Sequence, residues 1–154
     1  MRPPSPEILL EALAEALETM AFISPEPAAE GMAPPAESEC LSIHWTGCGG
    51  GELQLATTRQ FGELLAANIL ALEPGTPEAA QRAADALKEL CNITTGALLA
   101  RLSESPEEAL EMGLPSVRTM ADAATWQQFV GQPRTVMVLA EGQPLAARTE
   151  EART

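Results

Sequence analysis

The segment from Thr76 to Leu102 constrains the fold most, because its pattern predicts one helix of roughly 27 residues, or ~40 Å. Within it, Asp85, Glu89, Asn92 and Gly96 follow at spacings of four, three and four residues. At about 100° per residue these spacings place all four on one stripe of the helix. The helix is therefore expected to present carboxylates, an amide and a glycine along a single face.

The other face of this helix is apolar and is expected to pack on a core. It consists of Ala84, Leu87, Cys91, Leu98 and Leu102. Glycine inside a helix costs roughly 1 kcal/mol relative to alanine, and asparagine is also a poor helix former. An ordinary solvated acidic face is one interpretation of the stripe. The functional interpretation is that Glu89 and Asn92 project together towards a partner whose backbone comes close at Gly96.

The pattern Asp-x3-Glu-x2-Asn-x3-Gly resembles the phosphatase motif of the CheC/CheX/FliY family of bacterial chemotaxis proteins. Its surroundings resemble that family too, over roughly residues 6–149. A helix ends at Phe22, a glycine-rich turn spans Thr46 to Gly51, and a second helix, the motif helix and closing strands follow. The chain carries one copy of the motif, which resembles the CheX type.

The resemblance implies a function and a role for each motif residue. CheX-like proteins remove the phosphoryl group from the aspartyl phosphate of a CheY-like response regulator. By resemblance, Asn92 orients the attacking water, Glu89 pairs with a lysine of the regulator, and Gly96 gives clearance. Asp85, the fourth matching residue, either tunes docking or is a solvated like-charge neighbour of Glu89. The resemblance also implies that Mg²⁺ belongs to the regulator, that this chain needs no cofactor or metal of its own, and that the protein can form a homodimer.

The remaining pattern predicts an α/β domain of CheC-like class, with a mostly antiparallel sheet packed against the first and third helices and the motif helix exposed on one face. Helices are expected over about 6–22, 58–72 and 76–102, with a short one opening at Ser105 and stopping before Gly113. Alternating residues predict strands around 41–45, 53–55, 114–119, 134–140 and 145–149.

Several details of packing are also expected from the pattern. The second helix should turn a set of apolar residues inward: Phe61, Leu64, Leu65, Ile69 and Leu72. Trp126 and Phe129 are expected to pack on the core. The proline-rich segment 24–38 is predicted to be an irregular loop, and residues 150–154 a disordered tail.

Length and charge limit the kinds of partner. With 154 residues, the chain is expected to form one domain over 1–154. A formal net charge of −13 argues against binding to nucleic acid or to anionic membranes. The longest apolar stretch is too short to span a bilayer, and no secretory signal is evident at the N-terminus, so a cytoplasmic protein is expected.

Two other functions are open from the sequence. A non-catalytic module on the same fold would bind a response regulator without hydrolysing its phosphate. A small-molecule binding protein or unrelated hydrolase would need a deep apolar pocket beside His44, the only histidine. The three cysteines, Cys40, Cys48 and Cys91, fit neither a disulfide framework nor a zinc template.

Overall fold

The protein is built on one antiparallel sheet with helices on both faces. The computed structural model describes residues 4–28, 32–105 and 107–151. The strands described are β1 (Glu26–Pro27), β2 (Ser38–Thr46), β3 (Gly51–Thr57), β4 (Glu111–Met112), β5 (Ser116–Met120), β6 (Val136–Ala140) and β7 (Gln143–Glu151). The helices described are α1 (Pro6–Ala21), α2 (Arg59–Leu70), α3 (Pro77–Leu102) and α4 (Ala123–Val130).

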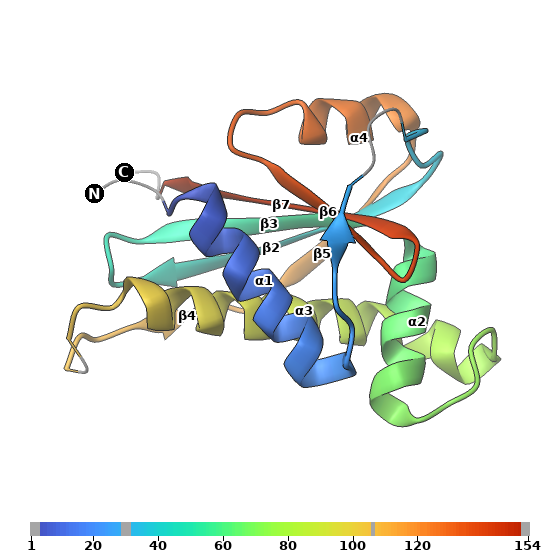
Figure 1. Ribbon diagram of the computed structural model, residues 1–154, viewed down its shortest axis with the longest axis horizontal. Coiled ribbons are helices and arrows are strands. Elements are labelled where there is room, and N and C mark those ends of the chain that lie inside the picture. The colour runs from blue at the N-terminus through green and yellow to red at the C-terminus, as the bar shows by residue number, and fades with distance from the viewer. Residues whose placement is uncertain (1–3, 29–31, 106, 152–154) are drawn as a thin grey trace.

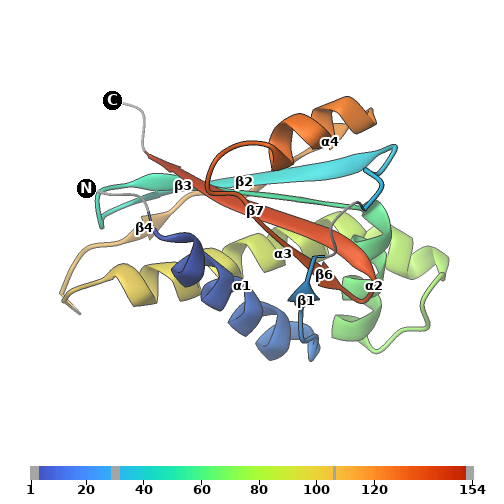
Figure 2. The same ribbon diagram turned by 45° about the horizontal axis from the view of Figure 1, so that its top comes forward.

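The strand order places β3 at the centre of the sheet. Neighbouring strands follow the order β1-β6-β7-β3-β2-β4, and β5 also pairs with β2. All pairs between the described strands are antiparallel. One face of the sheet is covered by α1 and α3, and α4 lies on the opposite face (Figures 1 and 2). The expected mostly antiparallel sheet, packed against the first and third helices, is confirmed.

Each of the four helices begins at a polar side chain that caps it. These residues accept hydrogen bonds from backbone N–H groups three positions on: Ser5 from Ile8, Thr58 from Phe61, Thr76 from Ala79, and Asp122 from Thr125. Such caps satisfy amides that have no partner inside the helix. The expected starts of the first three helices are confirmed, and the segment around Trp126 forms the helix α4.

The main core lies between the inner face of the sheet and the helices α1, α2 and α3. The buried face of α3 consists of Ala79, Ala83, Ala86, Leu87, Leu90, Cys91, Thr94, Thr95, Leu98 and Leu99. Helix α2 comes close to α3 at Gly62, where an added Cβ would lie 3.0 Å from Leu87 Cδ1 and 3.2 Å from the carbonyl oxygen of Ala83. Glycine at this position therefore allows the two helices to approach.

A second, smaller core lies on the other face of the sheet, beneath α4. Trp126 and Phe129 are both buried there, together with Cys40 and Met120. The guanidinium of Arg148 stacks 4.1 Å from the centroid of the Phe129 ring and donates a hydrogen bond of 2.7 Å to the Phe129 carbonyl. The expectation that the two aromatic residues anchor this segment by packing is confirmed.

The prediction of a short helix between Ser105 and Gly113 is wrong, because the described residues of that segment form no helix. A capping box requires the Glu108 side chain to reach back to the Ser105 amide. Instead, Glu108 Oε1 accepts a hydrogen bond of 2.9 Å from the backbone N–H of Cys48. The chain then continues as β4, which pairs with the end of β2. A tertiary contact thus replaces the local cap.

The ends of the sheet are longer than expected. Residues Glu26–Pro27 of the proline-rich segment form β1 and pair with β6, so this segment is not irregular throughout. Glu150 and Glu151 belong to β7 and pair with β3, which corrects their assignment to a disordered tail. Residues 29–31 of the segment and 152–154 of the tail lie outside the described residues.

Two apolar residues expected in the core are exposed instead. Ala84 is exposed because this N-terminal part of α3 packs mainly on α2, which contacts the neighbouring Ala83 and Leu87. Ile69 is 40% exposed near the C-terminal end of α2. The helical repeat was identified correctly, but the area covered by neighbouring elements is narrower than the apolar stripe.

The Glu108 contact gives a first prediction. Glu108→Ala should lower the free energy of unfolding by about 1–2 kcal/mol, because the Cys48 amide loses a charged acceptor in a partly buried place. Urea unfolding followed by circular dichroism measures this. Glu107→Ala removes an exposed carboxylate next door and should change stability by less than about 0.5 kcal/mol. Equal effects of the two variants would contradict the proposed contribution of the contact.

Candidate functional site

The four stripe residues of α3 lie on the side of the helix that faces away from the sheet core. Asp85, Glu89 and Gly96 are exposed and Asn92 is partly exposed. In the part of the chain that the structure describes, the Glu89 and Asn92 side chains form no hydrogen bond and no ion pair. The carboxylate and the amide, one turn apart, are therefore available to another molecule.

The stripe runs between two neighbouring helices. On one side, α1 is tied to the end of α3 by Arg101, whose Nη1 donates to Glu15 Oε2 at 3.0 Å and whose Nε lies 3.6 Å from Glu11 Oε2. Arg101 thus joins the end of α3 to the middle of α1, and the start of α1 lies towards the C-terminal end of α3, so the two helices run roughly antiparallel (Figure 1). On the other side, α2 packs against the first half of α3 (Figure 1).

Gly96 leaves open space on the exposed surface of α3. A Cβ placed on it would meet no described atom within 4 Å. Gly62 is required for the packing of α2 on α3, whereas no contact among the described residues requires a glycine at position 96. The glycine is thus a cost to the helix that nothing within the described part of the chain explains.

The other candidates named from the sequence do not join this site. His44 is exposed on the outer face of the sheet, opposite Glu52 of β3. It borders a hollow of about 550 Å³ whose lining includes Glu52, Glu150 and Glu151, and this acidic lining differs from the deep apolar pocket that a small-molecule site would require.

The three cysteines are free and buried. Burial raises the pKa of the Cys40 thiol, and burial and the nearby Cys40 raise that of Cys91 to about 12. A thiol with a raised pKa is a poor nucleophile at neutral pH. No group of three or more His, Cys, Asp or Glu residues suited to a metal ion occurs among residues 4–28, 32–105 and 107–151.

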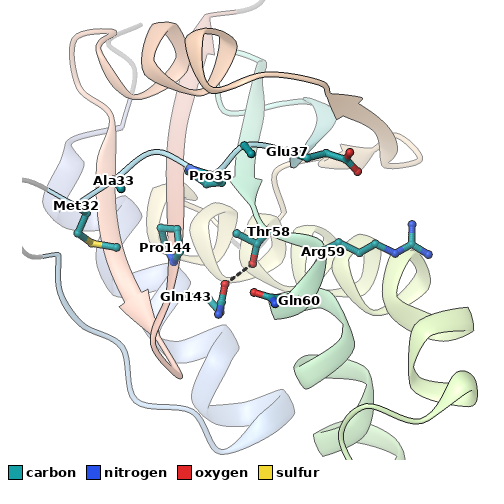
Figure 3. A pocket seen from close by; sticks show the side chains of 10 residues that line it. Met32, Ala33, Pro35, Glu37, Thr58, Arg59, Gln60, Gln143 and Pro144 are labelled. Atoms are coloured by element: carbon teal, nitrogen blue, oxygen red, sulfur yellow. Dashed lines mark hydrogen bonds between the residues drawn. The ribbon is translucent and has the colours of Figure 1, made fainter.

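A pocket of about 360 Å³ lies beside the proline-rich segment, apart from the stripe residues (Figure 3). It is bordered by Met32 to Glu37, by the first turn of α2 and by the turn at Gln143. Thr58 Oγ1 donates a hydrogen bond of 2.7 Å to Gln143 Oε1 at its floor, whereas the charged ends of Glu37 and Arg59 point away from it. The pocket contains no pair of groups suited to acid–base chemistry.

The mostly antiparallel sheet packed against helices is the CheC-like α/β fold, and the expected fold class is confirmed. Residues 40–136 match the family model described as chemotaxis phosphatase CheX, and the chain belongs to this family. No curated protein sequence matches the chain.

Solved structures share the fold at low sequence identity. A CheX from Desulfovibrio desulfuricans is 18% identical with a TM-score of 0.66, and the match covers 95% of this chain and 97% of that one. The CheX–CheY–BeF3–Mg²⁺ complex from Borrelia burgdorferi contains a chain that is 13% identical with a TM-score of 0.65, covering 99% and 100%. Thermotoga maritima FliY is 14% identical with a TM-score of 0.60, covering 95% and 87%.

Across the described residues, no helix is both long and apolar enough to cross a bilayer.

The open surface at Gly96 gives a second prediction. Gly96→Ala should leave the fold intact and stabilise α3 by up to about 1 kcal/mol, since the new methyl group meets no described atom. Thermal unfolding measures this. Gly62→Ala is the matched comparison and should destabilise the protein, because its methyl group would press on Leu87 and Ala83. A lower stability of the Gly96 variant would show that the glycine is needed for packing.

Proposed function

We propose that this protein hydrolyses the aspartyl phosphate of a CheY-like response regulator. The observation that carries the proposal is the pair Glu89 and Asn92, which lie on one helix stripe without side-chain partners among the described residues, in a chain of the CheX family. The partner class is supported by the Borrelia burgdorferi structure, in which a CheX is bound to CheY with BeF3 and Mg²⁺.

The chemistry requires little from this chain beyond position. Water attacks phosphorus, the bond between phosphorus and the aspartate oxygen breaks, and inorganic phosphate and a free carboxylate are released. Phosphoryl transfer is accelerated mainly by alignment of the nucleophile and stabilisation of charge. In this proposal Mg²⁺ and the lysine belong to the regulator, and the missing component is a correctly placed water.

Asn92 is suited to placing that water. Its amide oxygen accepts a hydrogen bond from water, while its NH₂ group donates to a phosphoryl oxygen. Because Asn92 has no hydrogen-bond partner among the described residues, insertion into the regulator's cleft breaks no internal hydrogen bond. We assign it the role of orienting the attacking water.

Glu89 is suited to fixing the register of the complex. It lies three residues before Asn92 on the same stripe, so an ion pair with the regulator's lysine determines where the amide arrives. Such a pair gains strength once docking excludes water from the joined surfaces. Asp85, one turn further towards the N-terminus, extends the acidic surface, and Gly96 gives clearance to the regulator's backbone.

Substitution of Asn92 tests the catalytic step. Asn92→Ala should lower the rate of dephosphorylation at saturating regulator by about 10²-fold or more, because the water is no longer positioned. Binding to a regulator loaded with BeF3⁻ and Mg²⁺ should persist. Gln81→Ala removes an exposed amide three turns away on α3 and serves as the control, with a rate expected within about twofold of the unmodified protein.

The results separate the phosphatase from the non-catalytic module. The measurement is the lifetime of ³²P-labelled regulators from the same organism, with and without the protein. Shortened lifetimes that depend on Asn92 support the enzyme. If the protein binds the regulator without changing the lifetime of its phosphate, the non-catalytic module is the function. If the Asn92→Ala variant shortens that lifetime as much as the unmodified protein does, the proposed role of the amide is refuted.

Substitution of Glu89 tests the docking step. Glu89→Ala should raise the KM for the phosphorylated regulator and lower kcat, because the ion pair both anchors the complex and sets the position of Asn92. Glu78→Ala, which removes an exposed carboxylate in the first turn of α3, is the control. A Glu89 variant with both constants unchanged would contradict the proposed pairing.

A further inference from the structure

We infer that the groove between α2 and α3 seats an apolar side chain of the response regulator, beside a basic residue that meets Glu89. This inference rests on the proposed function, because it takes the regulator as the partner. It adds a second contact next to the catalytic pair and identifies α2 as a determinant of which regulator is bound.

The groove is apolar at its centre. Helix α2 contributes Ala66, Ile69 and Leu70, and α3 contributes Ala86 to the lining. Ile69 is 40% exposed and Leu70 is 46% exposed, although both belong to residue types that are usually buried. Neighbouring exposed apolar side chains in a hollow are typical of interaction surfaces.

The size of the groove fits one side chain. Its volume is about 170 Å³. An engineered cavity of about 150 Å³ accommodates a benzene ring, whereas pockets for cofactors and drug-sized ligands span about 300–1,000 Å³. A leucine, isoleucine, methionine or phenylalanine side chain therefore matches the volume of the groove.

The rim of the groove is continuous with the candidate site. Asp85 and Glu89 border the groove on α3, and both also belong to the stripe that includes Asn92. A partner that places its cleft over Asn92 necessarily covers this rim. The same molecule is therefore the occupant of the groove, without any need for a second ligand.

Charge specifies the chemistry next to the seated side chain. The rim has two carboxylates, Asp85 and Glu89, and one guanidinium, Arg82. None of the three forms an ion pair with another described residue. The excess negative charge lies at the end nearest Asn92, so a lysine or arginine of the regulator is complementary there. An apolar anchor inside a polar rim is the usual anatomy of an interface hot spot.

The test compares two variants, Ile69→Ser and Leu10→Ser, whose original side chains are almost equally exposed. Ile69→Ser alters the groove, and Leu10→Ser alters a residue of α1 that is 39% exposed and lies outside it. For the phosphorylated regulator, Ile69→Ser should raise KM about tenfold with kcat unchanged within about twofold. It should raise the Kd for the regulator loaded with BeF3⁻ and Mg²⁺ by the same factor, and Leu10→Ser should change neither.

The binding measurement separates this inference from the proposed function. If the unmodified protein hydrolyses the phosphate and Ile69→Ser behaves like Leu10→Ser, the groove inference is wrong and the phosphatase stands. If the unmodified protein binds without hydrolysis and Ile69→Ser weakens binding, the groove is supported and the phosphatase is wrong. If the unmodified protein neither binds nor hydrolyses any regulator of its own organism, both are wrong. Equal thermal unfolding midpoints of the two variants exclude a folding effect.

Discussion

Packing of one face of α3 against the sheet determines how the rest of the molecule is presented. Leu87, Leu90 and Leu98 are almost completely buried on that face. A rotation of the helix by half a turn, about 180°, would turn these leucines towards solvent at roughly 1.5–3 kcal/mol each. It would also move Glu89 towards the core, where an unpaired carboxylate is strongly unfavourable. The outward direction of the stripe is therefore a consequence of the core.

Local sequence signals were sufficient to predict two kinds of feature: the residue at which a helix begins, and the residues that share one face of a helix. The caps at Ser5, Thr58 and Thr76 each make the backbone hydrogen bond that their residue type predicts. The exposure of Asp85, Glu89 and Gly96 follows from their spacing alone. These features depend on residues within a few positions of each other, which is the range over which sequence patterns are informative.

Features that depend on distant partners could not be predicted in the same way. Ser105 and Glu108 have the spacing of a capping box, but the Cys48 amide, 60 positions away, binds the glutamate instead. Glu150 and Glu151 are ordered because β3 supplies their backbone partners. Ile69 has the helical spacing of a core residue, yet the length of the covering helices leaves it at the surface. In the first two cases a tertiary contact overrides or completes what the local sequence indicates.

The candidate site is incomplete without another molecule. In isolation, Glu89 and Asn92 lie at an open surface, where water screens charge and competes for every hydrogen bond. Neither group has a neighbouring base or nucleophile in the described residues with which to carry out chemistry. In the proposed function, docking on the regulator removes this water and brings both groups to a phosphorylated carboxylate, so that the same two side chains act in a less polar environment.

This dependence on docking explains why the surroundings of the stripe matter as much as the stripe itself. A single ion pair at Glu89 fixes one point, and a rigid body held at one point can still rotate about it. On the α1 side, the exposed end of the stripe is flanked by Arg101 and its glutamate partners, which are already engaged with each other. On the α2 side, the groove at Ile69 offers an apolar contact without an internal partner. A second contact on that side opposes this rotation as the complex forms and so adds to its affinity, while Glu89 and Asn92 provide the alignment for the chemical step.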